Sequence, residues 1–486
     1  MTGTTPNAAS AVPLGERMQG LPDPIVIRQL YLGCLSQASY LVGDRSTGRA
    51  IAVDPRRDVD EMLDAAAEER LTIELVVETH FHADFLSGHL ELATATGAQI
   101  AIGAAGTTEF DSRKLADGEL IDLGTVQVEV WSTPGHTPES ISLLVRPAAG
   151  AVPAAVLTGD TLFIGDVGRP DLLVAAGVPV ASLGAQLYES IARLARLPDA
   201  TLVLPAHGAG SACGKALSSE TVSTIGEQRA SNYALAPMTR EQFVEIVTDG
   251  QPAAPGYFGY DAVLNRKARP LMDERPLALM DLATIDRAST DGAVVVDVRP
   301  TIDFAAGHLA GSLGIALDGR FAEQAGSLLG PDTSIVLAGD IEAIGEARVR
   351  LARIGFDRVR GALTDVESVL AAHPSRARRL SRLTAAAFNE RKKSLGDLLV
   401  VIDVRSPGEV AAAPLAGARN IPLTRLRTEL ATLDHSQPTV VLCAGGARSA
   451  IASSVLLASG FRDVSDVLGG VNALGDGDGD RTANST

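Results

Sequence analysis

Two histidines and an aspartate stand at alternate positions in the segment 79–85, which reads Thr-His-Phe-His-Ala-Asp-Phe. Imidazole and carboxylate groups are ligands for zinc and iron. More residues of these two types follow apolar segments later in the chain, and the full set is His80, His82, Asp84, His136, Asp160 and His207. Any one of them could be a turn aspartate or a hydrogen-bonded buried histidine. Six together, at consecutive segment ends, predict a metal centre.

A second kind of chemistry is indicated by Cys443, which opens the segment Cys-Ala-Gly-Gly-Ala-Arg-Ser at 443–449. Gly445 and Gly446 allow successive backbone N–H groups to turn inward, and the N-terminus of the predicted helix that follows adds positive potential. Both features favour a thiolate, which is the nucleophilic form of cysteine. Arg448 could hold an anionic donor or acceptor. The alternative, a buried structural cysteine, fits a glycine-rich loop poorly.

Composition and charge limit the possible partners of this chain. Its 486 residues suggest about three domains. It has no run of about 18 apolar residues, and its net charge of −17 disfavours nucleic acid and anionic membranes. Three sparse cysteines, Cys34, Cys213 and Cys443, do not form a disulfide framework, and no secretory signal is visible. We therefore expect a cytoplasmic protein without a membrane span.

Strands and helices must alternate to position the candidate metal ligands. Between residues 25 and 265, β-branched segments such as 73–80 and 154–163 alternate with helical patterns such as 183–197. Several predicted strands end in His or Asp, where a sheet edge presents polar side chains to a site. This alternation predicts a layered α/β fold.

The second half of the chain contains an internal repeat. GAVVVDVRP (292–300) matches LLVVIDVRSP (398–407), which places Asp297 and Asp403 106 positions apart. A duplication of this length predicts two copies of one small α/β domain. We expect five segments: a disordered leader at 1–24, a metal-binding domain at 25–265, α/β domains at 275–375 and 384–474, and a disordered tail at 475–486.

Five motifs within residues 25–265 resemble the persulfide dioxygenases of the metallo-β-lactamase superfamily, which fold as an αββα sandwich: THFHADF, STPGHTPES, LTGDTLFIGDVGRPDL, LPAHG and PGYFGYDAVLN. The resemblance implies one Fe(II) per chain, held by His80, His136 and Asp160. It places three further residues around these ligands, namely His82, Asp84 and His207. Two histidines and one carboxylate leave coordination positions open for O2 and substrate. Phe85 stands where two-metal hydrolases carry another histidine, so we expect a single ion.

The two repeated domains resemble rhodanese sulfurtransferase domains. This resemblance makes Cys443 the sulfur-carrying residue of the second copy. Aligning SIVLAGD (334–340) with TVVLCAGG (439–446) places Ala338 of the first copy opposite Cys443, and Asp340 adds a negative charge nearby. We therefore expect the first copy to be catalytically silent and to serve as a spacer or docking surface.

Three residues outside these sets, Cys34, Cys213 and Arg169, are interpreted separately. Cys34 lies in an apolar segment and is expected to be a core residue on a strand. Cys213 lies in a glycine loop beside Lys215, which could stabilise its thiolate. Our hypothesis is that Cys213 accepts or gates persulfide sulfur at the iron, and the alternative is a bystander. Arg169 could bind a substrate carboxylate or phosphate, or could form a salt bridge with Asp171.

The resemblances together imply a fused enzyme of sulfide detoxification. It would oxidise low-molecular-weight thiol persulfides with O2 to sulfite and thiol, and Cys443 would pass sulfane sulfur to sulfite, giving thiosulfate. The alternatives are a zinc thioester hydrolase of the glyoxalase II kind with accessory rhodanese domains, and a non-catalytic sulfur carrier or sensor. We expect small-molecule partners and a homo-oligomer. The sequence leaves open the direction of sulfur transfer and which thiol carries the persulfide, whether glutathione, coenzyme A or another.

Overall fold

The computed structural model describes residues 18, 20–172, 174, 177–251 and 253–475. Most of the leader expected at 1–24 and of the tail expected at 475–486 lies outside these residues. The chain divides into two compact units. The first ends at Ala254 and also includes Asp261–Leu271, while the second contains Pro255–Tyr260 and the chain from Met272 onward. Within the described ranges, no helix has the length and apolar character needed to cross a membrane.

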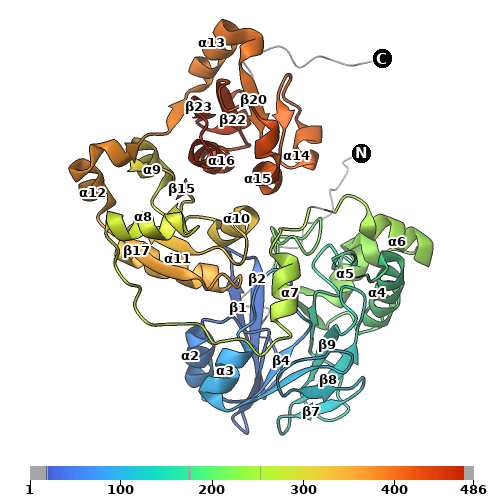
Figure 1. The fold of residues 1–486 in the computed structure, drawn as a ribbon. Helices are drawn as coiled ribbons and strands as arrows, with labels where there is room; N and C mark the ends of the chain where they lie inside the picture. Colours follow the sequence, from blue (N-terminus) through green and yellow to red (C-terminus); the bar gives the residue numbers. More distant parts are fainter. Residues whose placement is uncertain (1–17, 19, 173, 175–176, 252, 476–486) are drawn as a thin grey trace, which may run out of the picture. The chain divides into compact units, whose positions relative to one another are not determined.

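Two six-stranded sheets form the first unit (Figure 1). The first sheet has the order β1-β2-β3-β4-β5-β6, with bounds Ile25–Leu32, Gln37–Asp44, Arg49–Val53, Thr72–Glu78, Gln99–Gly103 and Arg113–Leu115. The second has the order β12-β11-β10-β9-β8-β7, and its strands β7 to β12 span Leu120–Asp122, Gln127–Ser132, Ile141–Arg146, Ala155–Gly159, Leu202–Pro205 and Ser223–Thr224. Strand β2 is buried along its whole length, as a strand covered on both faces should be.

Each sheet packs against the other sheet on one face and against helices on its other face. Aliphatic residues such as Val42, Val77 and Leu143 fill the space between the sheets. The outer face of the first sheet packs on Met62 of α2 (Asp60–Glu68) and Leu92 of α3 (His89–Thr96). The predicted αββα sandwich is therefore confirmed.

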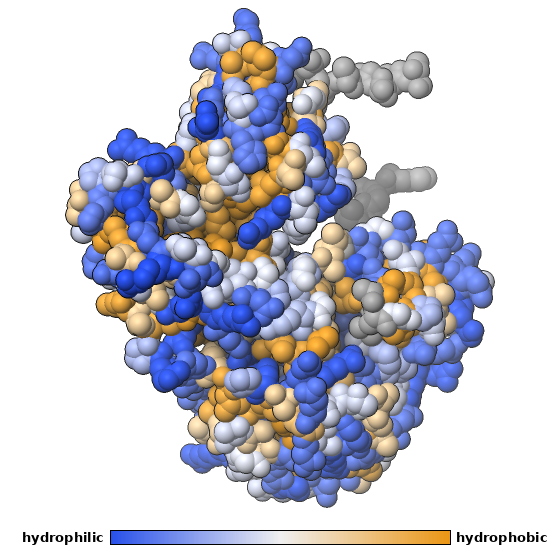
Figure 2. Space-filling model, in the orientation of Figure 1, coloured by the Kyte–Doolittle hydropathy of each residue, from blue (hydrophilic) through white to orange (hydrophobic). Residues whose placement is uncertain are grey.

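The outer face of the second sheet is covered by α4 (Val180–Leu194) and α6 (Arg240–Thr248), together with α5 (Ile225–Ser231) and the short turn η2 (Tyr233–Leu235). Helix α6 buries only Phe243 and Val247. Figure 2 shows mostly hydrophilic side chains where the outer side of α6 lies. This distribution is typical of an amphipathic surface helix.

Strand ends in both sheets lead to the candidate metal ligands. His80 follows β4, Asp160 follows β10, and His207 follows β11. His136 lies in the loop after β8, directly beyond Gly135, whose φ is 143°. A Cβ at position 135 would lie 2.4 Å from Cα of Leu187 in α4, so glycine is needed for the chain to turn here.

The second unit contains two α/β sheets built of parallel strand pairs. The first copy has the order β15-β13-β16-β17, with β13 at Val294–Asp297, β15 at Leu313–Gly314, β16 at Ile335–Ala338 and β17 at Val359–Leu363. The second copy has the order β19-β23-β22-β20-β21, and β19 to β23 span Ser381–Leu383, Val400–Asp403, Arg419–Asn420, Thr439–Leu442 and Val464–Val467. A separate pair is formed by β14 (His308–Leu309) and β18 (Ala377–Arg378).

Helices surround both sheets of the second unit. Those of the first copy are α8 (Leu282–Thr290), α9 (Thr301–Ala306), α10 (Phe321–Leu328), α11 (Ile341–Ala352), α12 (Val366–Ala372) and η3 (Pro374–Arg376). Those of the second are α13 (Ala385–Leu395), η4 (Gly396–Leu398), α14 (Pro407–Ala412), η5 (Leu423–Arg425), α15 (Leu426–Glu429), η6 (Leu430–Thr432), α16 (Ala447–Ala458) and α17 (Gly470–Ala473). Helix α7 (Phe258–Leu264) lies where the chain passes from one unit to the other.

The sheet register corrects the alignment of the two copies. Asp297 pairs with Ala338, and the equivalent Asp403 pairs with Leu442. Gly339 therefore stands opposite Cys443, and the prediction of Ala338 at this position was wrong by one residue. The loop between strand and helix has two residues, 339–340, in the first copy and four, 443–446, in the second. The sequence match did not show this difference in loop length.

The prediction for Cys34 was also wrong. Cys34 lies in the turn at 33–36 between β1 and β2, and it is only half-buried. The chain reverses there, because β1 and β2 pair antiparallel with Leu32 opposite Gln37. The apolar residues on both sides belong to two strands instead of one.

Candidate metal centre and sulfur-transfer loop

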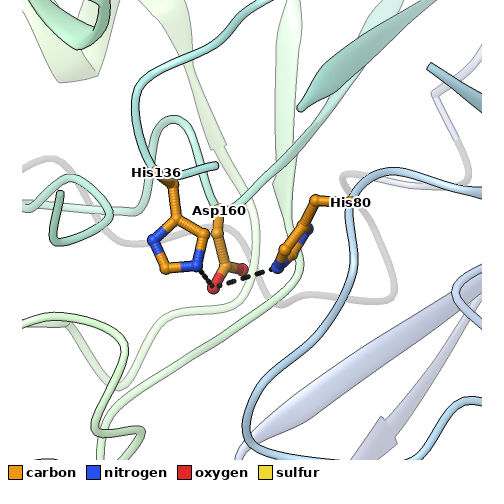
Figure 3. Close-up of side chains that lie close together, drawn as sticks. All are labelled: His80, His136 and Asp160. Atoms are coloured by element: carbon orange, nitrogen blue, oxygen red, sulfur yellow. Dashed lines mark ion pairs between the residues drawn. The ribbon is translucent and has the colours of Figure 1, made fainter. Parts of the chain in front are cut away.

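Three side chains from separate strand ends meet in the first unit (Figure 3). Nε2 of His80 lies 3.6 Å, and Nε2 of His136 lies 3.4 Å, from Oδ2 of Asp160. All three residues are buried, and one donor atom from each lies within 4.8 Å of the others. Two imidazoles and a carboxylate arranged in this way can hold one transition-metal ion.

The other ring nitrogen of each histidine is held by a neighbour. Nδ1 of His136 lies 2.9 Å from the carbonyl oxygen of Arg169, to which it can only donate. Nδ1 of His80 lies 3.0 Å from Oγ1 of Thr79, and this hydroxyl donates to Asp54 over 2.8 Å. These partners fix the tautomers so that the Nε2 lone pairs face Asp160.

Several buried atoms of this cluster have no hydrogen-bond partner among the described residues: Nε2 of His80, Nε2 of His207, Oδ1 of Asp84 and both carboxylate oxygens of Asp160. A buried polar atom without a partner is costly and rare in folded proteins. Burial and the nearby histidines, led by His82, hold the pKa of His80 well below its usual value, so its ring is neutral. The residues therefore fit a metal cation, which would satisfy Nε2 of His80 and the carboxylate of Asp160.

A second group lies beside the first and consists of His82, Asp84 and His207, again with donor atoms within 4.8 Å of one another. Nε2 of His207 lies 3.3 Å from Asp84 and 3.4 Å from Asp160, while its Nδ1 lies 3.1 Å from the carbonyl oxygen of Ser36. Even with phenylalanine at position 85, three residues with possible metal-ligand atoms, His82, Asp84 and His207, lie next to the first metal position.

His82 differs electrostatically from the other histidines. Its Nε2 lies 3.1 Å from Oδ1 of Asp54 and 3.7 Å from Glu78. Burial lowers the pKa of His82, but Asp54, Glu78 and Asp84 raise it more strongly, to about 9. Phe85 packs against the His82 ring, with centroids 4.4 Å apart, and closes this side of the site with apolar surface.

In the second unit, Cys443 lies directly after β22 and is buried. The backbone N–H of Gly446 donates to its Sγ over 3.1 Å, and Sγ lies 3.5 Å from Oγ of Ser449. Gly446 has a φ of 97° and is the N-cap of α16, so the thiol lies at the positive end of a twelve-residue helix. This geometry stabilises negative charge on the sulfur.

Arg448, in the first turn of α16, forms a bidentate ion pair with a residue that the sequence did not single out, Glu409. The two N···O distances are 2.8 and 2.6 Å. The hydrogen bond from Arg448 lowers the pKa of Glu409 to about 2, although partial burial acts in the opposite direction. Arg448 was expected to hold an anionic substrate, and in the structure its guanidinium is paired with a carboxylate.

The comparisons with known proteins give a family for each of two parts of the chain. A model of the metallo-beta-lactamase superfamily matches residues 32–207 and a model of the rhodanese-like domain matches residues 384–476. The human protein named persulfide dioxygenase ETHE1, mitochondrial, is 30% identical over 228 residues, which cover 46% of this chain and 81% of the human one. The chain belongs to the metallo-β-lactamase superfamily. Its C-terminal part is a rhodanese-like domain, as predicted, and the two domains indicate an enzyme.

Two further relatives of this metallo-β-lactamase protein extend the comparison. A crystal structure of a metallo-beta-lactamase from Staphylococcus aureus has a TM-score of 0.62 and 33% identity, and the match covers 70% of this chain and 99% of the other. The beta-lactamase hydrolase-like protein of Agrobacterium fabrum is 32% identical over 237 residues, 43% of this chain. The chain spans 52% of that relative's length.

Cys213 lies at the metal centre of the metallo-β-lactamase domain. It is fully buried, and its sulfur lies within 4.8 Å of donor atoms of Asp160 and His207. Burial, together with Asp84 and Asp160, raises the pKa of Cys213 well above its usual value, so the thiol is protonated. Its relay or gate role stays a prediction.

The expected help from Lys215 was wrong. Nζ of Lys215 donates to the carbonyl oxygens of Ile246 and Asp249, over 2.5 and 3.0 Å, and lies above the ring of Tyr233. Adjacent positions in a loop do not show in which direction the side chains point. The amine is therefore committed to α6 and does not stabilise a thiolate at Cys213.

Arg169 has the salt bridge that was considered as the alternative to substrate binding. Its Nε and Nη2 each lie 2.6 Å from a carboxylate oxygen of Asp171, and its side chain is buried. Nη1 also donates to the carbonyl oxygen of Ala212. The clear contribution of Arg169 to the metal centre is its backbone carbonyl, which orients His136.

Asn265 is a further site residue that sequence reasoning missed. Its side-chain amide donates to the carbonyl oxygens of His82 and Phe85, over 2.8 and 2.9 Å, and its oxygen accepts from the N–H of Ser87 over 2.8 Å. Asn265 lies just after α7 and is 1% exposed. It holds the metal-binding loop in place from 178 or more positions away, and only its presence in the last of the five motifs could have pointed to it.

Proposed function

We propose that the metallo-β-lactamase domain is a non-haem Fe(II) persulfide dioxygenase with one ion per chain. A low-molecular-weight thiol persulfide, O2 and water would give the free thiol and sulfite. The observation that carries the proposal is the buried set His80, His136 and Asp160, in which Nε2 of His80 and both carboxylate oxygens of Asp160 lack hydrogen-bond partners within the described ranges. The name of the human relative supports the same reaction.

The residues of this site prepare it for such an ion. Thr79 and the carbonyl of Arg169 hold His80 and His136 in the tautomer that presents Nε2. When bound, ferrous iron on two histidines and a carboxylate supplies open coordination positions and redox chemistry for O2 and a persulfide. Phe85, which is 1% exposed, keeps water away from the side of His82.

We further propose that the C-terminal rhodanese-like domain consumes the sulfite. The Cys443 thiolate would attack the outer sulfur of a second persulfide, and the thiol would leave with the electron pair of the broken S–S bond. Sulfite would then attack the outer sulfur of the Cys443 persulfide, releasing thiosulfate and restoring the thiolate. The N–H of Gly446 and the start of α16 support the negative charge on Sγ in both steps.

The two halves of this proposal are tested by one variant and one analysis. Cys443→Ser is expected to keep oxygen consumption with a thiol persulfide and to release sulfite where the wild type releases thiosulfate. Metal analysis of freshly purified protein is expected to find one iron per chain. Equal thiosulfate from the variant would contradict the coupling, and iron-free protein with full activity would contradict the dioxygenase.

A zinc thioester hydrolase of the glyoxalase II kind is a second candidate, because His82, Asp84 and His207 form another donor group beside the first. A protein named hydroxyacylglutathione hydrolase from a Polaromonas strain is 34% identical over 187 residues, 66% of its length. Two zinc ions per chain and thioester cleavage without O2 would favour this function. One iron and O2-dependent turnover would exclude it.

Location and assembly belong to the same proposal. We propose a cytoplasmic enzyme, supported by three cysteines that form no disulfide. Its partners would be a thiol persulfide, O2, sulfite and thiosulfate, with no nucleic acid or membrane surface. Self-association into a homo-oligomer stays a prediction, which sedimentation of the purified chain would test.

A further inference from the structure

The second unit allows an internal comparison, because its two copies share a fold and only one carries a thiol. Each copy has an arginine two residues after the aspartate that ends β13 in the first copy and β20 in the second. Both arginines are buried, and each lies 2.6 Å from its aspartate: Arg299 with Asp297, and Arg405 with Asp403. A pair that occurs in both copies belongs to the common fold.

The Glu409–Arg448 pair occurs only in the copy with the thiol. Helices α9 and α14 begin 106 positions apart, and so do α11 and α16. Glu409 therefore corresponds to Asp303, and Arg448 corresponds to Glu342. Both counterparts are acidic and exposed, so they cannot form an ion pair with each other. The Glu409–Arg448 pair is thus a feature of the copy that carries Cys443 and not of the fold that the two copies share.

Glu409 is fixed on two sides. Its Oε1 and Oε2 receive the guanidinium of Arg448, and Oε2 also accepts from the N–H and the hydroxyl of Ser406, each over 2.9 Å. The Ser406 contacts form the capping box of α14. Arg448 therefore faces the loop with its charge compensated. The attraction of an anion to Cys443 then depends mainly on backbone N–H groups and the α16 terminus.

We propose that Glu409 sets the charge selectivity of the Cys443 site. By neutralising Arg448 it keeps the binding of anionic sulfur compounds, such as sulfite and thiosulfate, weak relative to that of uncharged thiols. Weak binding lets an anionic product leave readily and makes thiosulfate a poor donor in the reverse direction. This inference rests on the proposed sulfurtransferase function and assigns a positioning residue to it.

The variant Glu409→Gln tests this inference in the full-length protein. Glutamine can still fill the capping box, so α14 keeps its N-terminal hydrogen bonds while the charge is removed. With thiosulfate as donor and dithiothreitol as acceptor, the KM for thiosulfate is expected to fall about fivefold, the size of a partly exposed charge interaction. The readout is the KM for thiosulfate divided by the KM for dithiothreitol, a ratio that a purely structural role of Glu409 would not change.

Two further variants isolate the charge. Asp303→Asn removes the corresponding carboxylate of the first copy. It is expected to leave the KM for thiosulfate and the KM for dithiothreitol unchanged. Arg448→Gln leaves the Glu409 carboxylate uncompensated, so the KM for thiosulfate is expected to rise above that of the wild type, and adding Glu409→Gln in this background is expected to return it toward the wild-type value. An unchanged thiosulfate KM in Glu409→Gln, or a thiosulfate KM in Arg448→Gln no higher than that of the wild type, would overturn the inference.

Alkylation of Cys443 gives a second readout that needs no turnover. The rate with anionic iodoacetate divided by the rate with neutral iodoacetamide, followed at the Cys443 peptide by mass spectrometry, is expected to rise about fivefold in Glu409→Gln. An equal ratio in both proteins would overturn the charge inference even if no transfer occurs. A wild type without Cys443-dependent transfer would instead contradict the proposed function.

Discussion

At the scale of single residues, Asp160 is the most constrained side chain of the metal centre. It is buried, three histidine rings approach it, and neither of its oxygens has a hydrogen-bond partner within the described chain. A carboxylate in such surroundings is stable only with a compensating cation. The stability of the domain should therefore depend on its metal.

Asp160→Asn is expected to abolish metal binding, so that the melting temperature of the variant no longer depends on metal. A chelator should lower the melting temperature of the wild type, because binding to the folded state stabilises it. The same chelator should leave the melting temperature of Asp160→Asn unchanged. Metal analysis and thermal unfolding measure both effects. Asp64→Asn, at an exposed position of α2, is the matched control and should behave as the wild type. A chelator-sensitive Asp160→Asn protein would contradict this assignment.

The residue types and their positions after apolar segments predicted six side chains around one site, and the family resemblance selected His80, His136 and Asp160 among them as ligands. Neither showed which charged side chains are already paired with other residues. Arg448 and Lys215 were given roles from their neighbours in sequence, whereas their partners, Glu409 and the α6 carbonyls, lie 39 and 31 or more positions away. The partner of a long side chain depends on tertiary contacts that no local pattern contains.

At the scale of elements, the chain after α7 holds the metal-binding loop. Asn265 contacts three backbone groups of residues 82–87, and Arg269 forms an ion pair with Glu91 and lies beside Ser87. The segment 265–269 therefore acts as a clamp on the loop between β4 and α3. The sequence placed the end of the metal-binding domain at residue 265 and indicated no role for the residues directly after it.

Asn265→Ala should loosen this clamp. It leaves two buried carbonyls and one buried N–H without their partner, which is expected to lower the free energy of unfolding of the first unit by about 3 kcal/mol. Urea unfolding of the metal-bound protein measures this change. Asn389→Ala, at an exposed position of α13, should change stability by less than about 0.5 kcal/mol. Equal stability of the two variants would remove Asn265 from the clamp.

Loop length is the second property at this scale. The first α/β copy has only Gly339 and Asp340 where the second has the four residues 443–446. Gly339→Cys in a Cys443→Ser background is therefore expected to give no sulfurtransferase activity, because the two-residue loop has no counterpart of the Gly446 N–H that donates to Sγ of Cys443. A thiosulfate assay measures this directly. Activity above that of Cys443→Ser alone would show that a thiol at this position suffices without the four-residue loop.

At the scale of the whole molecule, the sequence predicted the architecture better than its details. The layered α/β fold and the duplicated α/β domain follow from strand and helix alternation and from a repeat of 106 positions, which are long-range patterns. The αββα sandwich was implied by the resemblance of five motifs to a known family. The one-residue error at Ala338 arose because the copies differ by compensating changes in length, two more residues between the core strands of one and two more in the loop of the other. Only the hydrogen-bonded register distinguishes such cases.

The joining of two proposed activities in one chain has a measurable consequence. If sulfite made by the first domain is used by the rhodanese-like domain of the same molecule, the covalent link raises its effective concentration there. An equimolar mixture of Asp160→Asn and Cys443→Ser chains contains both activities on separate molecules. At protein concentrations near 10 nM, it is expected to release more free sulfite and less thiosulfate than the wild type at equal site concentration, on the order of tenfold in the ratio. Mixtures at rising concentration, with ion chromatography of both products, provide the control. An identical ratio at every dilution would mean that sulfite diffuses freely between molecules and that the link has no kinetic role.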